Sequence, residues 1–122
     1  MEIIKKEIDF NNSIFEILVL CALTNKDSRV YEIHKTLLEH SDNRINISTN
    51  TIYNILNKLL DKKLVSEHNV QQKAQDAYYQ LTAFGEAHLN RLLHYFYVNQ
   101  TVINQTIYQL TKNQNKTPFS VL

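Results

Sequence analysis

The stretch from Thr49 to Thr82 changes the spacing of its apolar residues partway along, and this change constrains the fold more than any other feature. Its first part gathers apolar residues on one side at 100° per residue, as a helix does: Ile52, Ile55, Leu56, Leu59 and Leu60. Two alternating segments rich in branched or aromatic residues follow, Leu64–Val70 and Ala77–Leu81, joined by the polar residues 71–76. We therefore expect a helix at about 49–62 and a β-hairpin, or wing, at about 64–81.

The side of this helix that faces away from the apolar stripe is suited to nucleic acid. It holds Asn50, Asn54, Asn57, Lys58 and Asp61, flanked by Thr51 and Tyr53. Asparagine is a poor helix former, but it can bond N6 and N7 of adenine, while Thr, Tyr and Lys suit phosphates or thymine methyl groups. A merely solvated polar face is the alternative. The expected DNA contacts are Thr49, Asn50, Thr51, Tyr53, Asn54 and Lys58, with Arg44 and Lys73 on flanking phosphates.

Positive charge is concentrated near this helix, although the whole chain of 122 residues has a formal charge of only +1. Residues 43–63 contain four bases and one acid, a net charge of +3: Arg44, Lys58, Lys62 and Lys63 against Asp61. A nucleic-acid site must therefore be local, and a local basic patch is what phosphate contact requires.

The composition favours a mostly helical, single-domain protein. One glycine and one proline leave little room for tight turns or glycine-rich phosphate loops, and 43% hydrophobic with 20% charged residues fits a globular chain. The single Cys21 cannot form an internal disulfide, and we expect it to pack as a small hydrophobe. The apolar run at 14–23 is short and contains Glu16, so we expect neither a signal peptide nor a membrane span. We therefore expect a cytoplasmic protein.

Further elements follow from spacing. We expect a helix from about Asn11 to Thr24 with a core-facing stripe of Ile14, Ile17, Leu18, Cys21 and Ala22. Its other apolar residues, Val19, Leu20 and Leu23, suggest that it is covered on two sides, as in a dimer.

Arg29 and Val30 are expected in a short strand. A second helix should span Tyr31–His40 with Ile33, Leu37 and Leu38 inward, Ser48 or Thr49 should cap the third, and Thr82 should cap a fourth that reaches about Leu110.

The fourth helix has an unbroken heptad seam with one polar member: Leu89, Leu93, Phe96, Gln100, Ile103, Ile107 and Leu110. Packing on its own domain is the alternative, but about 28 residues span about 42 Å, more than a small domain covers alone. We therefore expect a partner helix from a second chain, with Gln100 fixing the register. Ile14 and Leu18 should join the seam in a homodimer interface.

Catalysis and metal binding are not expected. His34 and His40, like His88 and His94, are six residues apart and so do not share a helix face, and His68 lies on an expected strand. No nucleophile–base arrangement or phosphate loop is present in the sequence. The chain should be no enzyme and should need no cofactor.

Three segments of the chain resemble the PadR (phenolic acid decarboxylase repressor) family of winged helix-turn-helix regulators: VYEIHKTL at 30–37, TIYNILNKLLDKKLV at 51–65 and YYQLTAFGEAHL at 78–89. The third matches the family's YYxLTxxGxxxL pattern with Tyr78, Tyr79, Leu81, Thr82, Gly85 and Leu89. Val30 and Lys63 stand where the family usually has glycine, and the wing tip QQKAQD offers only Lys73 as a cation.

The resemblance implies a mostly α fold with a small β-hairpin: a winged helix-turn-helix at 1–82, a C-terminal dimerisation helix at 83–112 and a loose tail at 113–122. It implies a repressor, with A/T-containing inverted repeats as typical targets. If the long helices of a homodimer pair about a two-fold axis, the two reading helices face the same side of double-stranded DNA, so we expect the target to be an imperfect palindrome. It also suggests a small-molecule effector in a cleft of Phe15, Tyr95, Phe96 and Tyr97, although such aromatics also serve plain dimer packing. The alternative function is a winged-helix dimer that acts mainly through a protein partner, with weak or lost DNA binding.

Overall fold

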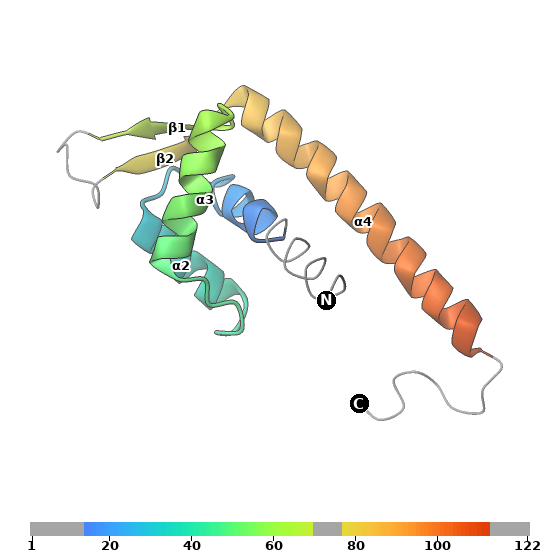
Figure 1. The fold of residues 1–122 in the computed structure, drawn as a ribbon. Helices are drawn as coiled ribbons and strands as arrows, with labels where there is room; N and C mark the ends of the chain where they lie inside the picture. The colour runs from blue at the N-terminus through green and yellow to red at the C-terminus, as the bar shows by residue number, and fades with distance from the viewer. Residues whose placement is uncertain (1–13, 70–76, 113–122) are drawn as a thin grey trace, which may run out of the picture. The chain divides into compact units, whose positions relative to one another are not determined.

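The computed structural model describes residues 14–69 and 77–112, which form helices and one hairpin (Figure 1). Residues 14–22 are helical. They are followed by α2 (Val30–His40), α3 (Thr49–Asp61), β1 (Val65–His68), β2 (Tyr78–Leu81) and α4 (Ala83–Thr111). The predicted fold class is confirmed, a mostly α chain with a two-stranded hairpin and a long last helix. The wing tip with Lys73, the expected tail and residues 1–13 lie outside the described residues.

The helix at 14–22 turns a different face to the core from the one predicted. Val19 and Leu20 are fully buried and Leu23 nearly so. The predicted core stripe is only half-buried: Ile14, Ile17, Leu18, Cys21 and Ala22. The prediction was wrong because this helix is apolar on most of its circumference, and spacing alone cannot say which side meets the domain.

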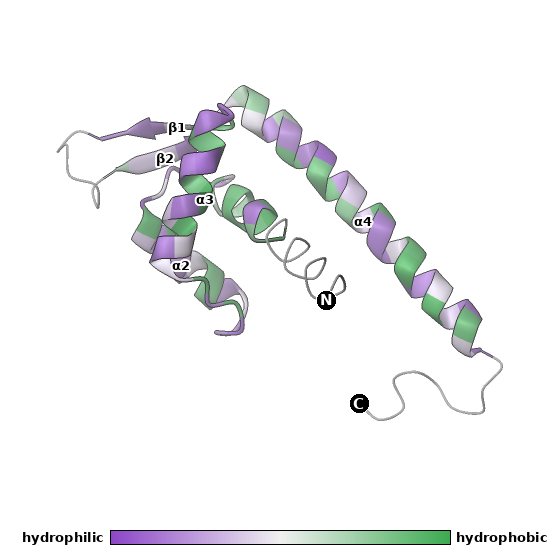
Figure 2. Cartoon of the chain, in the orientation of Figure 1, coloured by the Kyte–Doolittle hydropathy of each residue, from purple (hydrophilic) through white to green (hydrophobic). Residues whose placement is uncertain are grey.

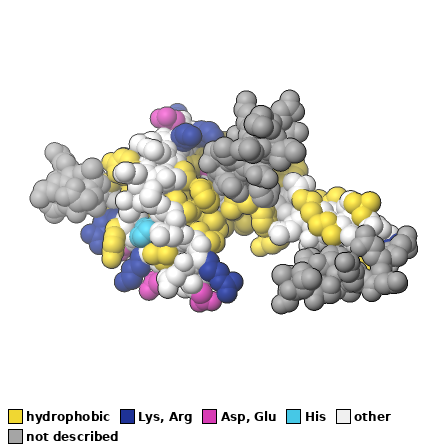
Figure 3. Space-filling view, turned by 60° about the horizontal axis from the view of Figure 1, so that its bottom comes forward, with side chains coloured by type: hydrophobic (Ala, Val, Ile, Leu, Met, Phe, Trp, Pro, Cys, Tyr) yellow, Lys and Arg dark blue, Asp and Glu magenta, His cyan; other side chains and the backbone are white. Residues whose placement is uncertain are grey.

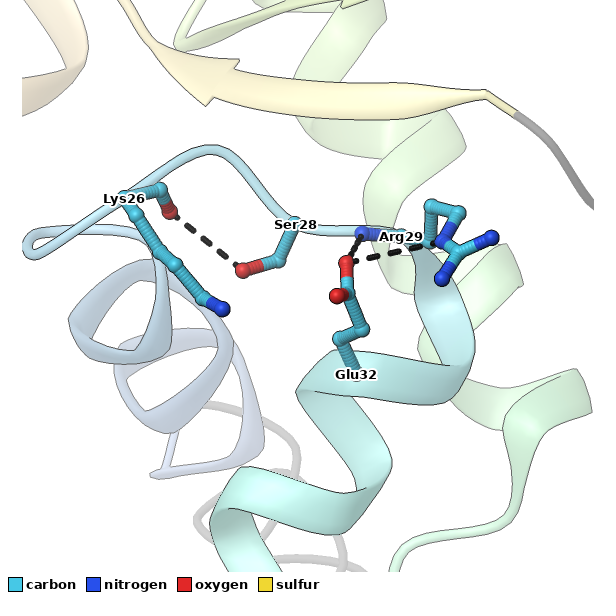
Figure 4. Close-up of polar contacts among 4 residues, drawn as sticks. All are labelled: Lys26, Ser28, Arg29 and Glu32. Atoms are coloured by element: carbon cyan, nitrogen blue, oxygen red, sulfur yellow. Dashed lines mark hydrogen bonds and ion pairs between the residues drawn. The ribbon is translucent and has the colours of Figure 1, made fainter.

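Helix α2 begins one residue earlier than predicted, and a carboxylate fixes its start. The Arg29 backbone N–H donates to Glu32 Oε1 at 2.9 Å, and Arg29 Nε lies 3.6 Å from the same oxygen (Figure 4). The hydrogen bond from the Arg29 backbone, together with nearby positive charge, lowers the pKa of Glu32 against the opposing effect of burial. The Glu32 carboxylate therefore supports this first turn at neutral pH, and its contribution is lost as the pH falls through its pKa.

The predicted short strand at Arg29 and Val30 is wrong, because Val30 is already helical. The extended residue is Ser28, which is buried and forms an isolated bridge with Tyr79. The Ser28 N–H donates to the Tyr79 carbonyl at 3.1 Å, and the Tyr79 N–H donates back at 2.9 Å. This bridge joins the start of α2 to the hairpin.

Helix α3 has the predicted amphipathic form, and the alternation of apolar and polar positions is visible along its ribbon (Figure 2). Ile52, Leu56 and Leu59 are fully buried, while Ile55 and Leu60 are half-buried. The cap is Ser48, whose hydroxyl oxygen accepts from the Thr51 N–H at 3.1 Å. That contact satisfies one of the backbone donors left open in a first helical turn.

The hairpin is short and antiparallel, with Val65 opposite Leu81 and His68 opposite Tyr78. Burial alternates along β2 but not along β1. On β2 the Tyr79 side chain is buried, and Tyr78 and Gln80 face outward. Val65 is buried at the base of β1, and the other three residues of that strand are exposed. The alternation predicted for the hairpin is thus confirmed on β2 but not on β1, where Glu67, the partner of Tyr79, is exposed.

The hairpin and α4 meet at a junction built from Thr82 and Gly85. The Thr82 hydroxyl donates to the carbonyls of Lys63 at 2.9 Å and Leu64 at 3.1 Å, and it accepts from the Gly85 N–H at 2.9 Å. A Cβ on Gly85 would overlap the Leu64 carbonyl oxygen. Only glycine therefore lets the first turn of α4 lie this close to the chain where α3 passes into β1.

The chain divides into two compact units, Met1–Asn90 and Arg91–Leu122, and α4 begins in the first and ends in the second. In the first unit, Gly85 and Leu89 of α4 are buried. In the second, α4 has no Lys, Arg, Asp or Glu between Arg91 and Lys112. Its exposed large apolar side chains are Tyr95, Tyr97, Val98, Val102, Ile103, Ile107, Tyr108 and Leu110.

Among the described helices, none combines the length and the hydropathy that a membrane span requires.

We expect Gly85→Ala to lower the free energy of unfolding by about 3 kcal/mol, the upper end of the usual cost of overpacking, since its obstacle is backbone. Chemical denaturation followed by circular dichroism measures this change. Asn90→Ala, at an exposed site on the same helix, is the control and should change stability by less than about 0.5 kcal/mol. A Gly85→Ala protein as stable as the parent would contradict the proposed close approach.

Candidate nucleic-acid interface

The predicted contacts on and before α3 lie on the surface of the first unit. Thr49, Asn50, Asn54 and Lys58 are exposed on α3, and Arg44 is exposed in the preceding loop. The buried residues Ile52, Leu56 and Leu59 hold the opposite side of the helix in the core. The helix therefore presents its polar face outward on a rigid support.

Two predicted contacts are partly engaged in the fold. Thr51 is half-buried, and its hydroxyl oxygen accepts from the Ser48 hydroxyl at 2.9 Å. Tyr53 is also half-buried and hydrogen-bonds to Tyr79 on β2. Burial, together with the charges of Tyr53 and Glu67 and this hydrogen bond, raises the pKa of Tyr79 far above its ordinary value. The hydroxyls of Thr51 and Tyr53 thus hold the helix start and the hairpin in place.

The turn between α2 and α3 orients the second helix. The Ser41 hydroxyl donates to the Leu37 carbonyl at 2.7 Å and accepts from the Ile45 N–H at 2.8 Å. His34 Nδ1 lies 2.8 Å from the Ile47 carbonyl, so this nitrogen is the donor. Asp42 and Asn43 take the left-handed backbone conformation with φ of 53° and 64°, which these residue types tolerate. Arg44 directly follows this turn.

Two backbone hydrogen bonds cap the C-terminal end of α3. The Lys63 N–H donates to the Leu60 carbonyl and the Leu64 N–H to the Leu59 carbonyl, both at 2.9 Å. Lys63 itself is left-handed, with φ of 62°. This is the arrangement in which glycine commonly follows a helix, and the structure explains why glycine would suit this position better than lysine.

Charge near α3 is positive but mixed. Arg44, Lys58, Lys62 and Lys63 are exposed, and so is Asp61. Figure 3 shows basic and acidic side chains interspersed over the winged-helix part of the face that it draws. The basic residues are placed to reach phosphates beside the helix, since exposed lysine side chains are long and mobile.

One cation near the hairpin was missed by sequence reasoning. The Arg29 guanidinium lies over the Tyr78 ring, 5.4 Å from its centroid, and Arg29 Nε also lies 3.6 Å from Glu32 Oε1. The signal available in the sequence is a basic residue directly before a helix, and the strand predicted at Arg29 and Val30 conceals it. Glu67 and His68, exposed on β1, bring no further permanent positive charge to the described part of the wing.

The aromatic residues of the predicted effector cleft are divided between the two units. Phe15, in the first unit, and Phe96, in the second, are half-buried. Tyr95 and Tyr97, in the second unit, are 63% and 64% exposed. The cleft stays a prediction that depends on assembly with a second chain.

A helix, a turn, a second helix with an outward polar face and a following hairpin together define a winged helix-turn-helix protein. Comparison with family models agrees with this class. The chain belongs to the transcriptional regulator PadR-like family, whose model matches residues 19–91. This family is made up of transcriptional regulators and not of enzymes, so the predicted resemblance and the predicted lack of an enzymatic role are both confirmed.

Solved structures similar to this chain have the same fold. A transcriptional regulator from Clostridium thermocellum matches with a TM-score of 0.74 and 21% identity over 81% of this chain and 95% of its own. A PadR-like transcription factor from Bacteroides fragilis matches with a TM-score of 0.69 and 20% identity over 84% of this chain and 98% of its own.

A third similar structure is that of Bacillus subtilis PadR in complex with operator DNA. Its TM-score is 0.59 and its identity 23%, and the match covers 66% of this chain and 47% of that protein. At these identities the likeness establishes the fold alone. A search of curated proteins finds no match.

We expect Lys63→Gly to raise the free energy of unfolding by about 1 kcal/mol. The left-handed conformation costs an ordinary residue about 1–2 kcal/mol, and the greater freedom of glycine in the unfolded chain offsets about 0.5–1 kcal/mol of that gain. Thermal unfolding measures the change. Lys63→Asn removes the same charge, and its free energy of unfolding should lie between those of the parent and of Lys63→Gly. If the parent with lysine were the most stable of the three proteins, the left-handed conformation would not be a cost at this helix end.

Proposed function

We propose that this chain is a homodimeric transcriptional repressor that binds double-stranded DNA at an imperfect palindrome through α3. The observation that carries the proposal is the division of α3, with Ile52, Leu56 and Leu59 fully buried and Asn50 and Asn54 exposed on the other side. Its apolar side fixes the helix, and its polar side suits the edges of bases in the major groove.

Phosphate contact is supported by the cations around α3. Residues 43–63 have four bases and one acid, or +3, in a chain of +1 overall. All four bases are exposed. Such a patch supplies the sequence-independent part of DNA affinity, while α3 supplies the selection of sequence. Lys73 at the wing tip is proposed as one more phosphate contact.

The homodimer is supported by the apolar surface of α4. Ile103, Ile107 and Leu110 of the predicted seam are 52%, 39% and 75% exposed in the single chain, and a patch of this kind on a regulator marks a contact surface. The half-buried Ile14 and Leu18 are proposed to join them. A two-fold axis through paired α4 helices would place two α3 helices about 34 Å apart, one turn of DNA, which requires a palindromic site.

A small-molecule effector is proposed at the dimer interface, lined by Phe15, Tyr95, Phe96 and Tyr97. Aromatic side chains left open by a single chain could close around an aromatic ligand once the second chain is in place.

The alternative function is a winged-helix dimer that acts through a protein partner. The near-neutral total charge and the exposed Glu67 on β1 favour it, since both weaken attraction to DNA. Binding to DNA from upstream of its own gene, measured at rising salt, separates the two functions.

For the repressor, we expect specific binding and a steep fall of affinity with salt. If Arg44, Lys58, Lys62, Lys63 and Lys73 of both chains contact phosphates, the dimer makes about ten such contacts, and log K should fall with log salt at a slope of about −9. Fluorescence anisotropy with a labelled upstream fragment measures this. Failure of every upstream fragment to compete better than random duplex at moderate salt would overturn the repressor proposal.

Asn54→Ala should reduce the binding free energy by about 1–3 kcal/mol through the loss of specificity at one base pair of each half-site. The affinity for random DNA should stay unchanged, because base contacts carry the sequence information. Lys58→Ala is the matched comparison on the same helix. It should weaken binding to all sequences and reduce the salt slope by about one for each chain. A uniform loss with Asn54→Ala would contradict base readout by Asn54.

Ile103→Asp should convert the dimer to a monomer, because it places an unpaired charge in the paired seam. The expected shift of the dissociation constant is at least about a hundredfold, or about 3 kcal/mol. Sedimentation equilibrium measures it, and the substitution spares the monomer fold since Ile103 is exposed there. Thr101→Asp, exposed on the other side of α4, is the control. Equal dimer dissociation constants for the two variants would contradict the proposed seam.

A further inference from the structure

Three asparagines form a single row along α3. Asn50, Asn54 and Asn57 are four and three residues apart, so at 100° per residue they fall within about 60° of one another. All three are exposed. Their row lies about opposite the fully buried side of the helix, which holds Ile52, Leu56 and Leu59. It is therefore the part of α3 that can enter a groove most deeply.

These asparagine side chains have no hydrogen-bond partner among the residues that the structure describes. Their polar neighbours do: the Thr51 hydroxyl is bonded to Ser48, and Tyr53 is bonded to Tyr79. Asparagine in a helix commonly turns back to bond nearby backbone, and it lowers helix stability relative to alanine. Three unengaged amides in one row are thus available to an outside partner that offers both a donor and an acceptor.

The chemistry of the row excludes some partners. Helix α3 contains no arginine, and Lys58 lies about 80° around the helix from Asn50. The row itself therefore has no cation, and Arg or Lys bonded to O6 and N7 is the usual reader of guanine. An amide offers a donor and an acceptor side by side, which matches N7 and N6 of adenine. Lys58 and Lys62 are placed beside the row, where phosphates would lie.

We infer that the row of Asn50, Asn54 and Asn57 reads adenines through their major-groove edge, and that guanine is not read by this row. The inference rests on the proposed function and assigns Asn57 to the contact surface. From residue 50 to 57 the helix rises about 10.5 Å. At about 3.4 Å for each base pair, the adenines of a half-site fall within a run of about three to four base pairs.

The test replaces single atoms of the DNA. The upstream fragment that the protein protects in a footprint is prepared with 7-deaza-adenine or 7-deaza-guanine at one position at a time, which removes only N7. We expect at least about a fivefold loss of affinity at two or three adenines within one short run of each half-site. Replacement of guanines should change the affinity by less than about twofold.

Variants of the full chain assign the contacts. Asn57→Ala should abolish the effect of 7-deaza-adenine at one of these positions and leave the others unchanged. Alanine favours the helix at this exposed site, so the variant should fold. Asn90→Ala, an exposed asparagine on α4, is the control and should keep every sensitivity of the parent.

Specific binding with no sensitivity to 7-deaza-adenine, or with equal sensitivity to 7-deaza-guanine, would overturn the inference and leave the proposed function intact. Retention of all sensitivities by Asn57→Ala would remove Asn57 from the row of readers and overturn its assignment. No specific binding of the unmodified fragment would overturn the proposed function, and the inference with it.

Discussion

The close approach of Gly85 to the Leu64 carbonyl sets the geometry of the winged-helix unit. At this point α3 ends, β1 begins and α4 starts, and the Thr82 hydroxyl bonds the carbonyls of Lys63 and Leu64. A side chain at residue 85 would push the start of α4 away from the hairpin. Tyr79 adds a second tie, because it bonds Ser28 through its backbone and Tyr53 through its side chain. The position of the exposed polar face of α3 depends on these contacts as much as on its own sequence.

The elements themselves could be predicted from sequence because their periods are unambiguous. The stripe of α3 and the alternation of the hairpin each allow one orientation, and Ile52 and Tyr79 are buried as those patterns require. The core face predicted for the helix at 14–22 is wrong, because nearly all its positions are apolar and the side that meets the domain depends on tertiary contacts. The short strand at Arg29 and Val30 failed for another reason. The Glu32 carboxylate starts α2 directly after Arg29, and this capping contact outweighs the β-propensity of valine.

The sequence predicts which polar residues of α3 lie outside the core, but it does not distinguish the part that each plays in the fold. Spacing placed Thr51 and Tyr53 beside the asparagines, yet both hydroxyls serve the fold. What distinguishes Asn50, Asn54 and Asn57 is the lack of an intramolecular partner among the described residues, which spacing cannot reveal. Arg29 was missed because its interest comes from Tyr78, a residue 49 positions away that the fold brings beside it. The apolar surface of α4 supports the proposed homodimer, because a single chain leaves these side chains exposed.

Recognition by a pair of α3 helices is the centre of this account, and the stoichiometry of the complex tests it most directly. Native mass spectrometry of the protein with its footprinted upstream fragment, in an excess of random duplex, counts the chains bound to one DNA molecule. We expect two chains on each specific duplex and little signal on the competitor. One chain for each duplex, or equal occupancy of the specific and random DNA, would contradict it.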